Sequence, residues 1–270
     1  MQGPSRAALA AGQDTLNGAM QAGAEREPLA EGLFAAAAAL DSSAALRRAL
    51  TDPSRDPAAR RSLVGRLFRG KVSEAAQSVL EELATARWSH ERDLGDAAEQ
   101  LAVEAVAAAA EEHQRLDSVE DELFRFGRIV AGSPDLREAL TDRGRDAEDR
   151  AALAAQLLAG KVSPETGRLI RQLVRAPRGR RFDRALDRYL DIAAARRRQL
   201  TAIVTAAVPL DDRQRDRLAA ALSSMYDRPV HVNVMLDPDV VGGIRVQIGD
   251  EVVDGTVLSR LDDARRRMAG

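Results

Sequence analysis

The sequence contains no cysteine among its 270 residues. Disulfide bonds, thiol catalysis and zinc sites built on thiolates are therefore excluded. Aromatic residues make up only 3% of the chain, which leaves few side chains for stacking on nucleic-acid bases. Alanine and leucine must instead fill the interior, and both favour helices, so the composition predicts a mainly helical protein.

Net charge of one sign and long apolar runs are also missing. The chain has 40 Lys and Arg against 42 Asp and Glu. Such mixed charge is typical of solvated helix faces, not of a surface that gathers phosphates. No run approaches the roughly 18 apolar residues that a membrane-spanning helix needs, and no signal peptide is expected at the N-terminus. Any membrane association is expected to come through a partner.

An internal repeat with an offset of 90 residues is the main positive feature of the chain. Residues 46–73 align without a gap with residues 136–163, and 15 of the 28 positions are identical. A period of this length indicates a duplicated module rather than a solenoid of short repeats. We expect two tandem helical bundles, over residues 1–94 and 95–198, followed by a small α+β C-terminal domain with a β-hairpin over residues 199–270.

Apolar residues in the second copy recur at spacings of three and four, which predicts short helices that share one core. The first expected buried stripe consists of Phe124, Phe126, Ile129 and Val130. Ser133 and Ser163 are each followed by proline, so both are expected to be helix N-caps.

The stretch from His90 to His113 contains no proline, and Gly95 is its only strong helix breaker. Through the offset of 90 it corresponds both to the end of the module, at 181–200, and to its beginning, at 5–22. We therefore predict one long helix that both bundles share.

The C-terminal part alternates turn signals with strand signals. Asp237-Pro238 opens a turn, and Gly242-Gly243 permits backbone angles that other residues avoid. Apolar residues then alternate with polar ones from Ile244 to Ile248, as in a half-buried strand. Gly249-Asp250 predicts the hairpin turn, and Asp254-Gly255 ends the second strand.

The remaining elements of this part follow from the same reasoning. We expect strands near 201–208 and 230–236 and a helix near 211–226, with Asp211 as its N-cap. Leu218, Leu222 and Met225 are its expected buried face. A last helix is expected from the N-cap Thr256 to Met268.

The order of these turn residues resembles the C-terminal signature of the delta subunit of F-type ATP synthases, the oligomycin-sensitivity-conferring protein family. The residues of the signature are Asp237, Pro238, Gly242, Gly243, Gly249, Asp250, Asp254 and Gly255. Residues from about 95 to 270 match the plan of that family, and residues 1–94 resemble an extra bundle, as in the extended delta subunits of actinobacteria. We expect the signature residues to be architectural, with no catalytic, cofactor-binding or metal-binding role.

The resemblance implies a non-catalytic subunit of the peripheral stalk, or stator, of the proton-translocating ATP synthase. Such a subunit links the N-terminal segments of the alpha subunits to the membrane-anchored b subunit, so that rotation is coupled to ATP synthesis. It implies no cofactor, no nucleic acid, a single copy in the complex and a peripheral location on the cytoplasmic face of the cell membrane. The family's alpha-binding surface corresponds to grooves beside about 97–112 and 165–175.

Two alternatives stay open, a helical nucleotide-binding module and a nucleic-acid-binding module. Residues 65–71 fit the first seven positions of a P-loop, but Val72 replaces the required Ser or Thr and no strand precedes them. A helix end at Gly70 is the favoured interpretation. The arginine clusters 178–181, 196–198 and 265–267 are expected to lay their stems on apolar helix flanks while their head groups stay in water.

Overall fold

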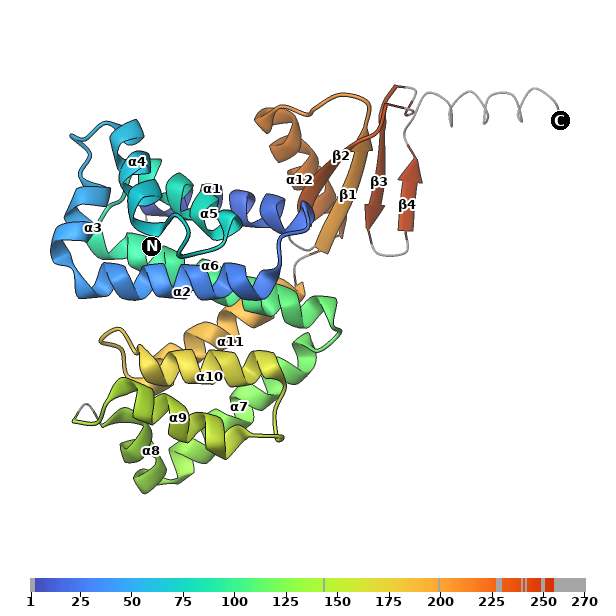
Figure 1. Ribbon diagram of the computed structural model, residues 1–270. Coiled ribbons are helices and arrows are strands. Elements are labelled where there is room, and N and C mark those ends of the chain that lie inside the picture. The colour runs from blue at the N-terminus through green and yellow to red at the C-terminus, as the bar shows by residue number, and fades with distance from the viewer. Residues whose placement is uncertain are drawn as a thin grey trace. The chain divides into compact units, whose positions relative to one another are not determined.

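The computed structural model describes residues 3–142, 144–198, 200–226, 230–238, 240, 242–248 and 251–254. The chain divides into two compact units, Met1–Arg196 and Arg197–Gly270. The first is helical and the second is a small sheet with one helix (Figure 1). The expected mainly α fold with a small α+β C-terminal part is confirmed. Within the described residues no single helix has the length and apolar character needed to cross a membrane, although the helices Arg26–Ser42 and Ala44–Thr51 together, bent by 108°, pass that test.

The helices of the first unit repeat with the offset seen in the sequence. They are α1 (Pro4–Gln21), α2 (Arg26–Ser42), α3 (Ala44–Thr51), α4 (Pro57–Phe68), α5 (Glu74–Thr85), α6 (Glu91–Glu112), α7 (Leu116–Gly132), α8 (Pro134–Thr141), α9 (Ala147–Leu158), α10 (Pro164–Arg175) and α11 (Phe182–Arg198). Both ends of α2 to α5 recur 90 residues later as the ends of α7 to α10. The duplication therefore extends from sequence to secondary structure.

The ends of these helices are set by local signals that both copies share. The side chains of Ser133 and Ser163 accept hydrogen bonds from N–H groups in the first turns of α8 and α10, so both predicted N-caps are confirmed. Gly70 and Gly160 follow α4 and α9 with φ of 73° and 68°, a conformation that glycine adopts without strain. The P-loop-like segment 65–71 thus lies at the end of a helix, and the N–H of Lys71 donates to the carbonyl of Phe68.

Helix α6 belongs to the cores of both copies. It contacts α1, α2, α3 and α5 on one side and α7 and α10 on the other. Its alanines are buried from Ala97 to Ala110, because small side chains let several helices approach at once. The predicted shared helix is confirmed, while the domain boundaries at residues 94 and 198 stay predictions.

The predicted stripe at the start of the second copy is half wrong. Phe126 and Val130 are buried, but Phe124 and Ile129 are 56% and 59% exposed. The buried face of α7 follows Leu116, Val119, Leu123, Phe126 and Val130. At about 100° per residue, Phe124 and Ile129 fall on opposite flanks of that face, about 140° apart.

The second unit is a four-stranded sheet with the order β2-β1-β3-β4. Its elements are β1 (Leu200–Ala206), α12 (Asp212–Tyr226), β2 (Val230–Leu236), β3 (Ile244–Ile248) and β4 (Glu251–Asp254). Strand β1 pairs in parallel with β2 and antiparallel with β3, so that Val204 lies opposite both Val234 and Val246. Strand β4 pairs antiparallel with β3 and completes the predicted hairpin.

Helix α12 packs Leu222 against the apolar face of this sheet. The carboxylate of Asp211 accepts from the N–H of Gln214, which confirms the predicted N-cap. The prediction for Met225 is wrong, because Met225 is 71% exposed. Tyr226, one residue later, packs against the core in its place.

Two helical glycines are expected to respond in opposite ways to alanine. A Cβ at Gly18 in α1 would meet nothing within 4 Å, so Gly18→Ala should stabilise the protein by about 0.5–1 kcal/mol. A Cβ at Gly32 in α2 would lie 2.7 Å from the Cβ of Ala76 and 3.0 Å from that of Val72. Gly32→Ala should therefore cost about 1–3 kcal/mol through overpacking. Urea denaturation of both variants measures the difference, and equal midpoints would contradict it.

Candidate interaction site around the shared helix

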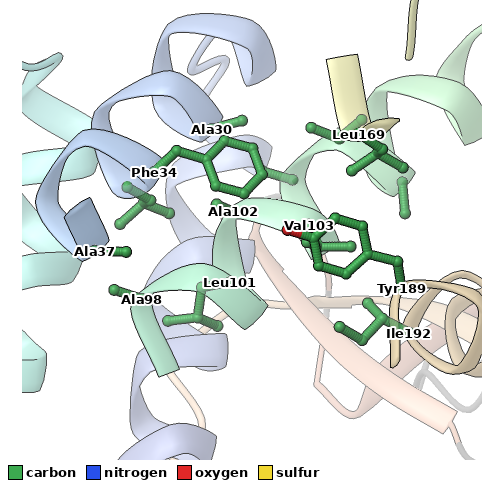
Figure 2. Close-up of a cluster of buried hydrophobic side chains, with 14 of the residues drawn as sticks. Ala30, Phe34, Ala37, Ala98, Leu101, Ala102, Val103, Leu169, Tyr189 and Ile192 are labelled. Atoms are coloured by element: carbon green, nitrogen blue, oxygen red, sulfur yellow. The ribbon is translucent and has the colours of Figure 1, made fainter. Parts of the chain in front are cut away.

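Helix α2 of the same chain packs along α6 and reaches α10 through ion pairs, where the groove was expected. Phe34 of α2 is only 3% exposed and belongs to one buried cluster with Ala102 of α6 and Leu169 of α10 (Figure 2). Ala30 and Ala37 lie on the same side of α2 and are also buried. The apolar residues of α6 and α10 are thus already buried by other helices of the same chain.

Ion pairs hold α2 along α10. The guanidinium of Arg168 on α10 donates to the carboxylate of Glu27 and lies 3.0 Å from that of Glu31. The Arg168 side chain is only 13% exposed, so these contacts are partly screened from water. The surface that the family resemblance assigned to alpha binding, beside 97–112 and 165–175, is therefore not free in this chain.

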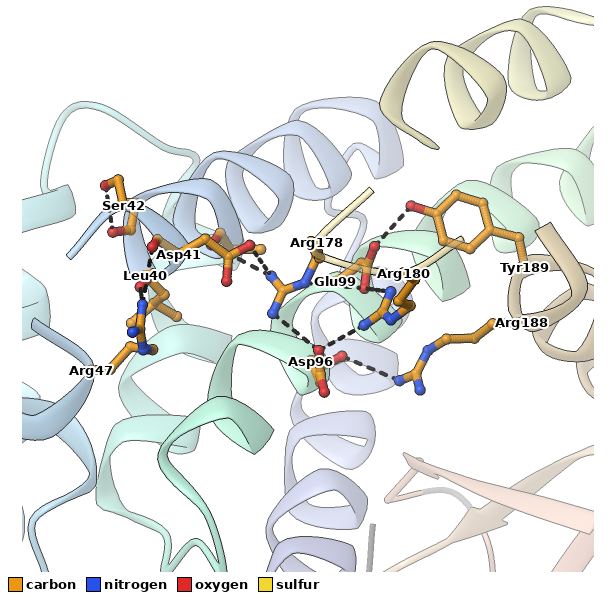
Figure 3. Close-up of polar contacts among 12 residues, drawn as sticks. Leu40, Asp41, Ser42, Arg47, Asp96, Glu99, Arg178, Arg180, Arg188 and Tyr189 are labelled. Carbon is orange, nitrogen blue, oxygen red and sulfur yellow. Dashed lines mark hydrogen bonds and ion pairs between the residues drawn. The ribbon is translucent and has the colours of Figure 1, made fainter. Parts of the chain in front are cut away.

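A cluster of charged side chains, with Arg178 and Glu99 buried at its centre, joins the loop between α10 and α11 to α2 and α6 (Figure 3). Arg178 pairs with Asp41 of α2 at 3.0 Å and donates to Asp96 of α6 at 3.0 Å. Arg180 donates to Asp96 at 2.7 Å and to Glu99 at 2.6 Å. The loop of the second copy is therefore tied to helices of the first.

Glu99 is the most buried acid of this cluster, with 1% of its surface exposed. It also accepts a hydrogen bond of 3.1 Å from the phenol of Tyr189. Burial, together with this neighbouring carboxylate, raises the pKa of Tyr189 well above its usual value. Burial alone would lower the pKa of Arg180, but Glu99 and Asp96 outweigh it and raise that pKa. The cluster thus links α2, α6 and the loop between α10 and α11 through ion pairs and hydrogen bonds.

The expectation for the first arginine cluster holds for Arg181, whose side chain is 84% exposed, and is wrong for the other two arginines. The side chains of Arg178 and Arg180 are 5% and 20% exposed, so their head groups are not in water. The missed signal was Gly95, the one glycine of α6. A Cβ there would lie 2.8 Å from the Nη2 atom of Arg178, so the glycine makes room for the guanidinium.

The other arginine clusters contribute less to this junction. Arg196, near the end of α11, pairs with Glu111 of α6 at 2.8 Å. Residues 265–267 lie outside the described part of the chain, as do Thr256 and the predicted last helix.

One cavity beside the loop between α10 and α11 is bordered by side chains of the helical framework. This cavity of about 470 Å³ in the second copy is bordered by Arg137, Arg150, Phe182 and Leu186. The guanidinium groups of Arg137 and Arg150 donate to backbone carbonyls, which fixes them as parts of the framework. Across the residues that the structure describes, no group of three or more His, Cys, Asp or Glu could hold a metal ion.

The C-terminal signature residues lie in the turns of the second unit, as far as they are described. The N–H of Asp237 donates to the carbonyl of Ala206 at the end of β1. Gly242 and Gly243 have φ of 63° and 81° ahead of β3. Asp254 is the last residue of β4, and Pro238 directly follows Asp237. Gly249, Asp250 and Gly255 lie outside the described residues, and the architectural role of the set stays a prediction.

Comparisons with known proteins point to one family. Residues 102–268 match the family model described as ATP synthase delta (OSCP) subunit. A protein of Kineococcus radiotolerans named ATP synthase subunit delta is 51% identical over 269 residues, covering 99% of this chain and 98% of that protein. Proteins of the same name from Streptomyces avermitilis and Streptomyces griseus are 47% and 45% identical over 268 and 271 residues. The likeness therefore includes the first copy of the module.

Proposed function

Because this chain belongs to the family of ATP synthase delta (OSCP) subunits, we propose that it is a stator subunit that joins the alpha subunits of the catalytic head to the membrane-anchored b subunit. It has no active site of its own in this proposal. It works from the cytoplasmic face of the membrane and reaches the bilayer only through its partners. The observation that carries the proposal is the 51% identity over 269 residues to a protein named ATP synthase subunit delta.

The helix packing of the first unit supports a mechanical role. A stator must transmit force without yielding, and close-packed helices deform little. Here one helix, α6, serves the cores of both copies, and charges such as Glu99 and Arg178 fasten them together. The two bundles are thereby held as one compact unit.

In this proposal the alpha subunit binds a surface other than the grooves beside 97–112 and 165–175 that the family resemblance implies. Helix α2 fills the groove beside α6 and α10, with Phe34 in the buried cluster and Arg168 paired to Glu27. A segment of alpha could enter that groove only by displacing α2. We therefore propose that alpha meets another surface of the chain.

Removing the chain from the assembled synthase should uncouple it. We expect the depleted complex to retain ATP hydrolysis and to lose most ATP-driven proton pumping, measured by the quenching of a pH-sensitive dye in vesicles. Adding back the purified full-length chain should restore pumping. Pumping that stays undiminished in the depleted complex, or ATP turnover by the purified chain, would overturn the proposal.

A further inference from the structure

The second helix of each copy carries the same pattern of two acids followed by a phenylalanine. In α2 the residues are Glu27, Glu31 and Phe34, and in α7 they are Asp117, Asp121 and Phe124. Each residue of α7 follows its counterpart by 90 positions. Spacings of four and three place each trio on one face of its helix. We call the trio on α7 the acidic-Phe face.

The two copies of this face have different surroundings. Phe34 is 3% exposed, because α6 and α10 of the following copy cover it. Phe124 is 56% exposed. No third copy of the module follows the second along the chain, whose next described unit is the sheet of residues 200–254. The phenylalanine of this pattern is thus buried in the first copy and exposed in the second.

The covered copy shows which chemistry suits this face. Phe34 lies in a cluster with the small Ala102 and the branched Leu169 (Figure 2). Glu27 and Glu31 both meet the guanidinium of Arg168, one residue before Leu169. A helix that carries an arginine next to a branched apolar residue therefore satisfies the acids and the phenylalanine together.

We propose that the acidic-Phe face of α7 is a docking surface for a basic amphipathic helix of a partner subunit. Asp117 and Asp121 supply negative charge at the N-terminal end of the face, and Phe124 supplies the apolar anchor. The exposed Arg128, one turn beyond Phe124, marks where the acidic stretch ends. Asp121 also contacts Arg125 one turn along α7, but both side chains are largely exposed, at 52% and 71%. Such a surface pair contributes little and can exchange for a partner cation.

Charge argues against a second copy of this chain as the occupant. The helix that corresponds to α10 in the first copy is α5, where Ser78 replaces Arg168. Glu74 and Glu82 lie one turn to either side of Ser78, and Glu74 is exposed. Acids on α5 would meet acids on α7, and the pairing would be repulsive. The occupant must bring its own positive charge.

Photo-crosslinking in the intact synthase tests the proposal. A benzoylphenylalanine is placed at position 124 or, as the matched control, at position 129 of the full-length chain. Ile129 is as exposed as Phe124 but lies on the other flank of α7. We expect position 124 to give an adduct with a Lys- or Arg-rich helical segment of another subunit, at least fivefold stronger than any adduct from position 129.

Charge reversal completes the test. The double change Asp117→Lys with Asp121→Lys should reduce the adduct from position 124 at least fivefold, and the thermal midpoint of the purified chain should stay within about 2 °C. The proposal is overturned by an absent adduct at 124, by equal adducts at 124 and 129, by an adduct to a second copy or a non-basic segment, or by insensitivity to charge reversal. Any of these results leaves the proton-pumping test of the stator role unaffected.

Discussion

Replacing Glu99 with alanine is expected to destabilise the first unit by about 3–5 kcal/mol, the usual cost of removing one partner from a buried ion cluster. Glu99 is 1% exposed and accepts from Arg180 and from the phenol of Tyr189. Without it, the guanidinium of Arg178, 5% exposed, keeps only Asp41 and Asp96 as counter-charges. Arg180 and the phenol of Tyr189 would each lose an acceptor in a site that water does not reach, which leaves buried donors unsatisfied.

Thermal unfolding followed by circular dichroism measures this effect. For a unit of this size the midpoint should fall by roughly 10 °C. Asp183→Asn is the matched control, because its pair with Arg181 joins side chains that are 53% and 84% exposed. That change should stay within about 1 kcal/mol. Equal unfolding midpoints for the two variants would show that the charge cluster does not stabilise the contact between the two bundles.

A chain that begins at residue 95 is expected to fail as a monomeric folded protein. This cut removes α1 to α5 and strips α6 of α2, its most extensive neighbour. Leu101, Ala102 and Leu169 of α10 are fully buried in the full-length chain, and they would be exposed to water in the fragment. Exposed apolar faces of this kind drive association, so the fragment should aggregate or form oligomers.

Size-exclusion chromatography with light scattering decides this prediction. The control is a chain that ends at residue 196, where the two compact units separate. It keeps every helix that packs on α6 and should be monomeric, with the unfolding midpoint of the first unit in the full chain. A monomeric, cooperatively unfolding fragment from residue 95 would contradict the shared-core account and would favour two independent bundles.

Much of the fold was predictable because its signals are local. The offset of 90 residues located α2 to α5 and α7 to α10, and serine caps such as Ser133 marked where helices begin. Glycine after α4 marked where a helix ends, through the positive φ of Gly70. The strands β2 and β3 followed from alternation between turn residues. Apart from the repeat itself, each of these signals is contained in a few neighbouring residues.

The junction was less predictable because its contacts join distant parts of the chain. Arg178 and Asp41 are 137 positions apart, and nothing near either residue specifies the other. A run of arginines looks the same whether its head groups are in water or buried. Only Gly95 gave a local hint, since a glycine in an alanine-rich helix often makes room for a neighbouring group.

The sequence by itself determined the family, the duplicated module and the positions of its helices and strands, because these depend on residue order and short-range spacing. Only the tertiary structure showed in which copy of the module the phenylalanine of the shared helix pattern is buried. Phe34 and Phe124 occupy equivalent positions, yet one is buried and the other is 56% exposed. The physical reason is that burial depends on what packs against a face, and only the first copy has another copy following it.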